Sequence, residues 1–95
     1  MRLSVAEINN FKESIKAIDA DAIIYLFGSR TNDLARGGDI DIAVFSKLMG
    51  RMGKAAVKNN FYKNFGEQKI DIVVLNGQED PFWQVIKDQS ILLSA

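Results

Sequence analysis

Residues 22–45 read Ala-Ile-Ile-Tyr-Leu-Phe-Gly-Ser-Arg-Thr-Asn-Asp-Leu-Ala-Arg-Gly-Gly-Asp-Ile-Asp-Ile-Ala-Val-Phe, and this stretch decides the fold. Its first apolar run, 22–27, predicts a buried strand that the following Gly-Ser pair ends abruptly. After a polar loop, Asp39 and Asp41 open a second apolar run that continues to Phe45. Because side chains alternate between the two faces of a strand, both aspartates are predicted to point to the same face.

Two carboxylates side by side repel each other, and each resists burial, so stability alone would not select Asp39 and Asp41 on a core strand. A divalent cation removes this conflict, because hard cations bind carboxylate oxygens. One or two Mg²⁺ ions could bind there and in turn hold triphosphate oxygens. Taken alone, an Asp-x-Asp pair is more often a pair of solvated aspartates at the mouth of a strand.

The Gly28-Ser29 turn adds a second element to this pattern. Gly28 lets the backbone turn sharply and lets a ligand approach closely, while Ser29 offers a hydroxyl and a backbone N–H. If a short helix begins here, its free N–H groups form an anion site. Gly-Ser alone is more simply a turn, but a strand, this turn and a nearby Asp-x-Asp together predict a phosphate site beside a metal site. Arg30 and Arg36 flank it, either to neutralise phosphate or as solvated surface residues.

A third carboxylate occurs in the run 68–75, an apolar strand with Asp71 inside it. A lone acid in such a run is costly unless it is paired or ligated, although a strand-end aspartate exposed to water would also explain it. If this strand lies next to the Asp39–Asp41 strand, all three carboxylates converge.

These residues carry a resemblance to a known family. Phe27-Gly28-Ser29-Arg30, then Gly37-Gly38-Asp39-Ile40-Asp41-Ile42, then Asp71 resemble the minimal nucleotidyltransferase (MNT) domain of the DNA polymerase β-like nucleotidyltransferase superfamily. The resemblance extends from Ile23 to about Leu93. It implies an α/β (α+β) fold in which a small mixed sheet has its helices packed on one face. Nine residues separate Ser29 from Asp39, one fewer than is usual in the antitoxin branch, and we expect the loop to tolerate this.

The resemblance implies transfer of a nucleoside monophosphate, AMP from ATP, to a hydroxyl acceptor, with Mg²⁺ or Mn²⁺. It places Asp39, Asp41 and Asp71 as catalytic metal ligands, with Asp71 also helping to deprotonate the acceptor. It places Gly28, Ser29 and Arg30 at the nucleotide.

The acceptor follows from the resemblance too. MNT proteins are often encoded beside a HEPN-domain protein as antitoxin and toxin, and some resemble enzymes that adenylylate a tyrosine of that partner. One alternative is a non-catalytic binding module that inhibits its partner by contact, although a relic has no physical reason to keep three converging acids. A second alternative is a transferase acting on a small molecule such as an aminoglycoside, which the lack of room for an acceptor domain disfavours.

Length and composition set limits on these hypotheses. Ninety-five residues predict one domain, 1–95, of ordinary soluble composition with 47% hydrophobic and 25% charged residues. Twelve basic and 12 acidic residues give zero net charge, which argues against direct nucleic-acid binding. The chain has no Cys and no His, which excludes disulfides, thiolate or imidazole metal sites and Ser-His triads. Without a membrane-length apolar run or a signal-peptide pattern, we expect a cytoplasmic protein, and a homo-oligomer remains open.

Three helices are expected around these strands. Ser4 and Glu7 have capping-box spacing at the start of a helix over 4–18, and Leu3 and Ile8 fit a hydrophobic staple. A looser pattern predicts a second helix over 51–65 with Gly66 as its C-cap. Asp80-Pro81 predicts a third helix that runs to about Asp88. The expected inward positions of the three helices are Val5, Ile8, Phe11, Ile15 and Ile18; Met52, Ala55, Ala56, Phe61, Tyr62 and Phe65; and Phe82, Val85 and Ile86.

Three shorter segments complete the prediction. Residues 30–35 are expected to form a short helical stretch. Trp83 either packs in the core or lies at an interface, where tryptophan is enriched. The apolar end 91–93 needs cover from its own domain or from a partner.

Overall fold

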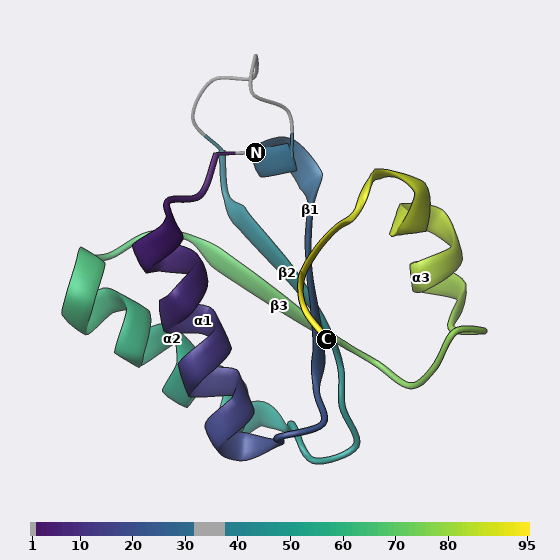
Figure 1. Ribbon diagram of the computed structural model, residues 1–95, viewed down its shortest axis with the longest axis horizontal. Coiled ribbons are helices and arrows are strands. Elements are labelled where there is room, and N and C mark those ends of the chain that lie inside the picture. Colours follow the sequence, from purple (N-terminus) through teal and green to yellow (C-terminus); the bar gives the residue numbers. More distant parts are fainter. Residues whose placement is uncertain (1, 32–37) are drawn as a thin grey trace.

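The computed structural model describes residues 2–31 and 38–95, without the side chain of Ser29. Within these ranges, helices and strands alternate along the chain (Figure 1). In order they are α1 (Val5–Ile18), β1 (Ile23–Phe27), the 3₁₀ turn η1 (Gly28–Thr31), β2 (Ile40–Phe45), α2 (Arg51–Phe65), β3 (Ile70–Leu75), α3 (Pro81–Ile86), the 3₁₀ turn η2 (Lys87–Gln89) and β4 (Ile91–Ser94). The predicted helical stretch 30–35 lies mostly outside the described residues.

The four strands form one mixed sheet in the order β3-β2-β1-β4. β1 runs antiparallel to both β2 and β4, whereas β2 and β3 are parallel. The parallel pair is joined through α2, since parallel neighbours need a long crossover. The predicted α+β fold with a small mixed sheet is confirmed.

Helix α1 begins as its sequence predicts. The Ser4 hydroxyl accepts a bond from the Glu7 backbone N–H at 3.1 Å, and the Glu7 carboxylate accepts one from the Ser4 backbone N–H at 2.9 Å. Such a reciprocal pair satisfies two of the free N–H groups at a helix start. Val5, predicted to be buried, is instead 74% exposed, because Leu3 before the cap fills the core at this end of the helix.

Helix α2 packs beside α1 along a narrower line than predicted. Gly53, Val57 and Phe61 form this line at four-residue spacing, and Phe61 stacks on Phe11 of α1 with ring centroids 4.9 Å apart. Such a pair contributes roughly 0.5–1.5 kcal/mol beyond its buried area. Four residues predicted to be inward are exposed, because they lie on the flanks of this line: Met52, Ala55, Ala56 and Phe65.

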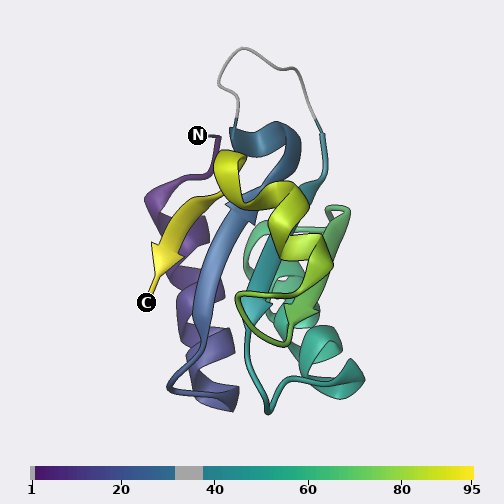
Figure 2. The ribbon, with the colours of Figure 1, turned by 90° about the vertical axis from the view of Figure 1, so that its right-hand side faces the viewer.

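Helix α3 lies on the opposite face of the sheet from α1 and α2 (Figures 1 and 2). The expectation that all helices pack on one face is therefore wrong for α3. Trp83 is buried in this second layer, with ring centroids 4.7 Å from Tyr25 and 5.0 Å from Phe45. A helix of six residues can turn only one narrow stripe inward, so Phe82 and Val85, predicted to be inward, are 39% and 73% exposed.

The apolar end of the chain is covered only in part, since Leu93 packs against the core whereas Leu92 is 51% exposed. Residues 91–94 form β4, an edge strand paired with β1, which the sequence analysis did not anticipate. Lys16 of α1 donates from Nζ to the carbonyl oxygens of Ala22 at 2.6 Å and Ala95 at 3.1 Å. This one ammonium therefore ties the end of β4 to the turn before β1.

Candidate active site

The parallel register of β2 and β3 places Asp41 directly beside Asp71. Residues of odd number on these strands face α3, so the two carboxylates lie on the α3 side of the sheet, near the start of both strands. Asp41 lies on an inner strand and is half-buried, whereas Asp71 lies on the edge strand and is exposed. The predicted meeting of these two aspartates is thus found in the structure.

Burial, followed by the negative charges of Asp71 and Asp39, raises the pKa of the Asp41 carboxyl above its ordinary value. Each of these influences disfavours the ionised carboxylate. The nearby charge of Lys69 opposes this shift only in part, and a bound cation would oppose it further.

Gly28 brings the end of β1 against this cluster. Its φ of +76° lies in the left-handed region that favours glycine, and its neighbour Phe27 pairs in register with Asp41. A Cβ added to Gly28 would overlap the Asp41 Oδ2 and would lie 3.1 Å from its Cγ. Position 28 therefore excludes a side chain for two independent reasons, conformation and close approach.

Asp39 lies near the pair but is directed elsewhere. Its Oδ2 is 3.3 Å from Nζ of Lys69, the residue just before β3. A hydrogen bond to Asp39, and then the charges of Asp39 and Asp71, raise the pKa of Lys69. Among the described residues no three acidic side chains converge on a metal-binding position, so the predicted convergence of Asp39, Asp41 and Asp71 is not found.

The backbone before Asp39 is held from two sides. Arg30 Nε donates to the Gly38 carbonyl at 3.4 Å, and Gln68 Nε2 donates to the same oxygen at 3.3 Å. Arg30 also donates from Nη1 to the Arg2 carbonyl at 2.7 Å, which anchors the N-terminal segment. Sequence reasoning assigned Arg30 to the nucleotide, and the structure shows a guanidinium that also supports the loop carrying Asp39.

Ser29 and Arg36 are the remaining residues predicted at the phosphate site. The Ser29 backbone belongs to η1, directly after Gly28, while its side chain, like Arg36, lies outside the described residues. Sequence reasoning missed Gln68 and Lys69. Their signal was present, because two polar residues immediately before a strand parallel to β2 must lie beside the residues that precede β2.

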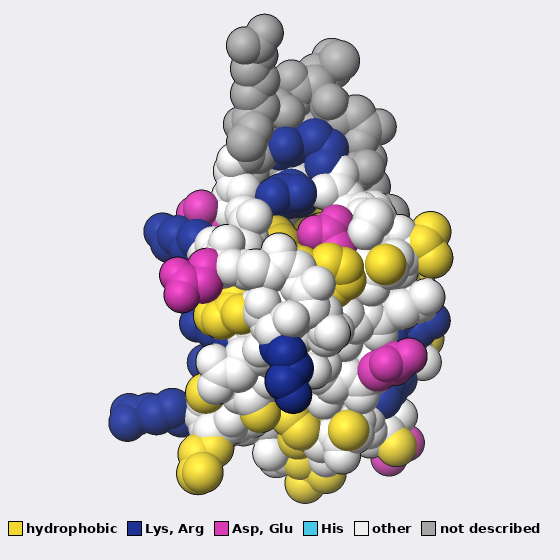
Figure 3. Space-filling model, turned by 90° about the vertical axis from the view of Figure 1, so that its left-hand side faces the viewer, with side chains coloured by type: hydrophobic (Ala, Val, Ile, Leu, Met, Phe, Trp, Pro, Cys, Tyr) yellow, Lys and Arg dark blue, Asp and Glu magenta, His cyan; other side chains and the backbone are white. Residues whose placement is uncertain are grey.

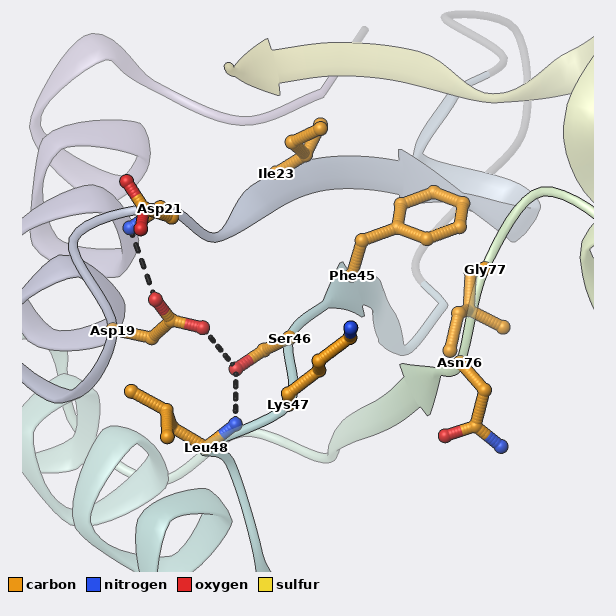
Figure 4. Close-up of a pocket in the computed structure, with 10 residues that line it drawn as sticks. Asp19, Asp21, Ile23, Phe45, Ser46, Lys47, Leu48, Asn76 and Gly77 are labelled. Carbon is orange, nitrogen blue, oxygen red and sulfur yellow. Dashed lines mark hydrogen bonds between the residues drawn. The ribbon is translucent and has the colours of Figure 1, made fainter.

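A separate cavity of about 350 Å³ lies at the other end of the sheet (Figure 4). Its wall contains Asp19, which accepts bonds from the Ser46 hydroxyl at 2.5 Å and the Asp21 backbone N–H at 3.0 Å. The Ser46 hydrogen bond, followed by that of Asp21, lowers the pKa of the Asp19 carboxyl. Because Asp19 is fully engaged in joining two loops, we assign it a structural role rather than a place in the aspartate cluster.

The donor set fits a hard divalent cation. Asp41 and Asp71 present carboxylate oxygens on one sheet face, and carboxylate oxygens are the ligands that hard divalent cations take. The absence of a side chain at Gly28 lets the end of β1 approach the Asp41 carboxylate closely. The residues present therefore match Mg²⁺ or Mn²⁺ in ligand chemistry.

The outer surface shows no single dominant charge on the view that faces α1 and α2, where basic and acidic side chains are interspersed among the described residues (Figure 3). This agrees with the zero net charge of the sequence. Among the described residues, every helix is too short or too polar to cross a bilayer.

Comparison with known proteins identifies the family. Residues 7–95 match the sequence model of the family described as polymerase beta, nucleotidyltransferase. A search of curated proteins gives no significant match. The match covers nearly the whole chain, including Gly28 and all three aspartates, and the mixed sheet with its flanking helices is consistent with that fold. The chain therefore belongs to the polymerase β nucleotidyltransferase family.

Proposed function

We propose that this protein transfers AMP from ATP to a tyrosine hydroxyl of a HEPN-domain partner and thereby acts as its antitoxin. The observation that carries the transferase chemistry is the register of Asp41 with Asp71, with Gly28 seated against Asp41. Membership of the nucleotidyltransferase family supports the reaction class. The resemblance of the Gly-Ser and Asp-x-Asp motifs to minimal nucleotidyltransferases supports the partner and the antitoxin role.

In this proposal, separate residues hold the metal ion and the phosphate groups. Asp41 and Asp71, joined by Asp39, would hold Mg²⁺, which supplies charge neutralisation for the triphosphate. Gly28 and the backbone N–H groups of η1 would bind phosphate oxygens at the end of β1, with Ser29 and Arg30 beside them. The backbone bonds of Arg30 and Gln68 to Gly38 would keep Asp39 within reach of the pair.

Asp71 is the group best placed to activate the acceptor. It lies exposed on the edge strand, so a hydroxyl on another protein can approach it from the open side of the sheet. Asp71 would accept the hydroxyl proton while the oxygen attacks the α-phosphorus. The new O–P bond forms as the bond to pyrophosphate breaks, and pyrophosphate leaves with its electron pair.

The exposure of Asp71 favours a macromolecular acceptor over an enclosed small molecule. A transferase acting on an aminoglycoside needs a concave pocket that encloses its acceptor, whereas a tyrosine on a partner protein is positioned by contacts between the two protein surfaces. A protein acceptor therefore suits a carboxylate on an open sheet edge.

Intact mass spectrometry tests this function. The protein is mixed with ATP, Mg²⁺ and the product of the neighbouring gene, the proposed HEPN-domain partner, and the partner's mass is measured. We expect an increase of one or more AMP units, located on tyrosine by peptide mapping. If the partner is silenced with no change in mass, inhibition is by contact and adenylylation is the wrong function.

Asp71→Asn is the matched variant for this assay. General-base assistance contributes on the order of 10²–10⁴ in rate, so most transfer should be lost. Much of the metal-dependent ATP binding should remain, because ground-state binding and transition-state stabilisation are separable. A variant that modifies the partner at the wild-type rate would remove Asp71 from the catalytic role.

A further inference from the structure

The residue that holds Asp39 in the structure is a cation, Lys69, and this pairing has a consequence for metal binding. Nζ of Lys69 lies 3.3 Å from the Asp39 Oδ2. Lys69 directly precedes β3, so the ammonium lies at the end of the sheet that also carries Asp41 and Asp71. The ammonium thus binds one carboxylate that a metal ion would need. Because the ammonium and the metal ion are both cations attracted to the same carboxylate oxygen, they compete for it.

We propose that Lys69 is a built-in counter-ion that positions Asp39 in the metal-free protein and is displaced when a divalent cation binds. This inference rests on the proposed function, because it concerns the same carboxylates. It assigns Lys69 a positioning role, and its effect reaches the metal only through Asp39.

Two features of the structure make displacement feasible. The Lys69 side chain is 69% exposed and that of Asp39 is 42% exposed, so solvent screens their attraction and the pair can separate. Lys69 also lines an open hollow of about 560 Å³ together with Tyr62, Glu67 and Gln68, which gives the released side chain room beside the site.

The backbone around the pair is fixed by bonds that do not involve the ammonium. The Ile40 N–H donates to the Lys69 carbonyl at 3.0 Å, and Gln68 holds the Gly38 carbonyl. Loss of the Lys69 charge should therefore leave the two strands paired and change only the freedom and charge of Asp39. This separation makes a side-chain substitution interpretable.

The test is Mn²⁺ binding without nucleotide, measured by electron paramagnetic resonance and by calorimetry on the full chain. We expect Lys69→Gln to bind Mn²⁺ about two- to five-fold more tightly than wild type, the range that an exposed ion pair can supply. Lys69→Arg retains the charge and should bind Mn²⁺ as wild type does. Lys47→Gln makes the same charge change at the opposite end of β2, so it should leave the affinity unaltered.

The outcomes separate this inference from the proposed function. Equal Mn²⁺ affinity of wild type and Lys69→Gln, including no detectable binding by either, overturns the counter-ion role. An equal gain in Lys47→Gln also overturns it, because the effect would then come from net charge alone. Failure of the proposed function is read independently, from wild-type protein that leaves the HEPN partner unmodified in the presence of ATP and Mg²⁺.

Discussion

At the scale of single residues, the site depends on one position that must be glycine and one carboxylate whose surroundings disfavour its ionised form. Gly28 has a positive φ and no space for a Cβ, and it lies against Asp41. Asp41 is half-buried among like charges, which raises its pKa. Neither arrangement favours stability, and both are explained if the space above Asp41 is kept for a ligand.

Gly28→Ala should destabilise the protein and abolish nucleotide binding. A left-handed conformation costs a non-glycine residue roughly 1–2 kcal/mol, and the added Cβ also meets the Asp41 carboxylate. Gly66→Ala is a control for backbone strain alone, because Gly66 has φ +86° and ψ 172°, a region open essentially only to glycine, with no atom near the added Cβ. Thermal melts should show a loss of stability for both variants, whereas only Gly28→Ala should lose nucleotide binding. Nucleotide binding by Gly28→Ala with the wild-type affinity would mean that the approach to Asp41 is unimportant.

Asp41→Asn should leave the melting temperature of the metal-free protein unchanged or raise it. Removing the charge relieves the repulsion from Asp71 and Asp39, and about 1 kcal/mol shifts the melting temperature of a domain of this size by roughly 4–8 °C. Asp88→Asn, on the exposed turn η2, controls for the change in net charge. A marked loss of stability specific to Asp41→Asn would show that this carboxylate is a structural hydrogen-bond acceptor.

At the scale of elements, two polar links hold the loops at the ends of the strands. Arg30 and Gln68 fix the backbone before β2, where the aspartates lie. At the opposite end, the Ser46 hydroxyl joins Asp19 of the α1–β1 turn to the backbone N–H groups of Leu48 and Met49 before α2. The second link ties the α1–β1 turn to the segment between β2 and α2.

Ser46→Ala should lower the free energy of unfolding at neutral pH and should make that free energy depend less on pH in the acidic range. The Ser46 bond lowers the pKa of Asp19, so the stability it contributes is complete above the ordinary value of 3.8 and is lost as pH falls through the lowered value. Denaturant unfolding from neutral pH to below about pH 4 measures this. Ser14→Ala is the control, because the Ser14 hydroxyl donates to a backbone carbonyl that does not titrate. An unchanged pH profile in Ser46→Ala would contradict the assignment.

At the scale of the whole molecule, a neutral protein presents a local cluster of negative charge, while the proposed substrate ATP is itself strongly negative. In the proposed function, binding of ATP would therefore be coupled to binding of a cation. In a small cooperative domain, ligand that binds only the folded state raises the stability of every element together.

ATP should raise the melting temperature only when Mg²⁺ or Mn²⁺ is present. A ligand at 100 times its dissociation constant adds about 2.7 kcal/mol, which corresponds to roughly 10 °C or more for a domain of this length. Calorimetric titration gives the affinity directly, with EDTA as the metal-free control. Equal ATP affinity in EDTA would remove the metal from the proposed site.

The sequence by itself determined strands β1, β2 and β3, the helix caps and the candidate chemistry. Ser4 and Glu7 specified the start of α1. Period-two alternation set the face of Asp41, whereas Asp39 lies before β2 and pairs with Lys69. These are local properties, because a cap or an alternating strand depends on residues within a few positions of each other.

Tertiary structure alone decided which of these elements meet. β4 exists because β1 offers it an edge, and α3 covers the second sheet face because Tyr25 and Phe45 leave an aromatic surface there for Trp83. The same holds at the site, where Lys69 takes Asp39 away from the Asp41–Asp71 pair. Contacts between residues distant in the chain depend on packing, and no local pattern encodes which partner a side chain will find.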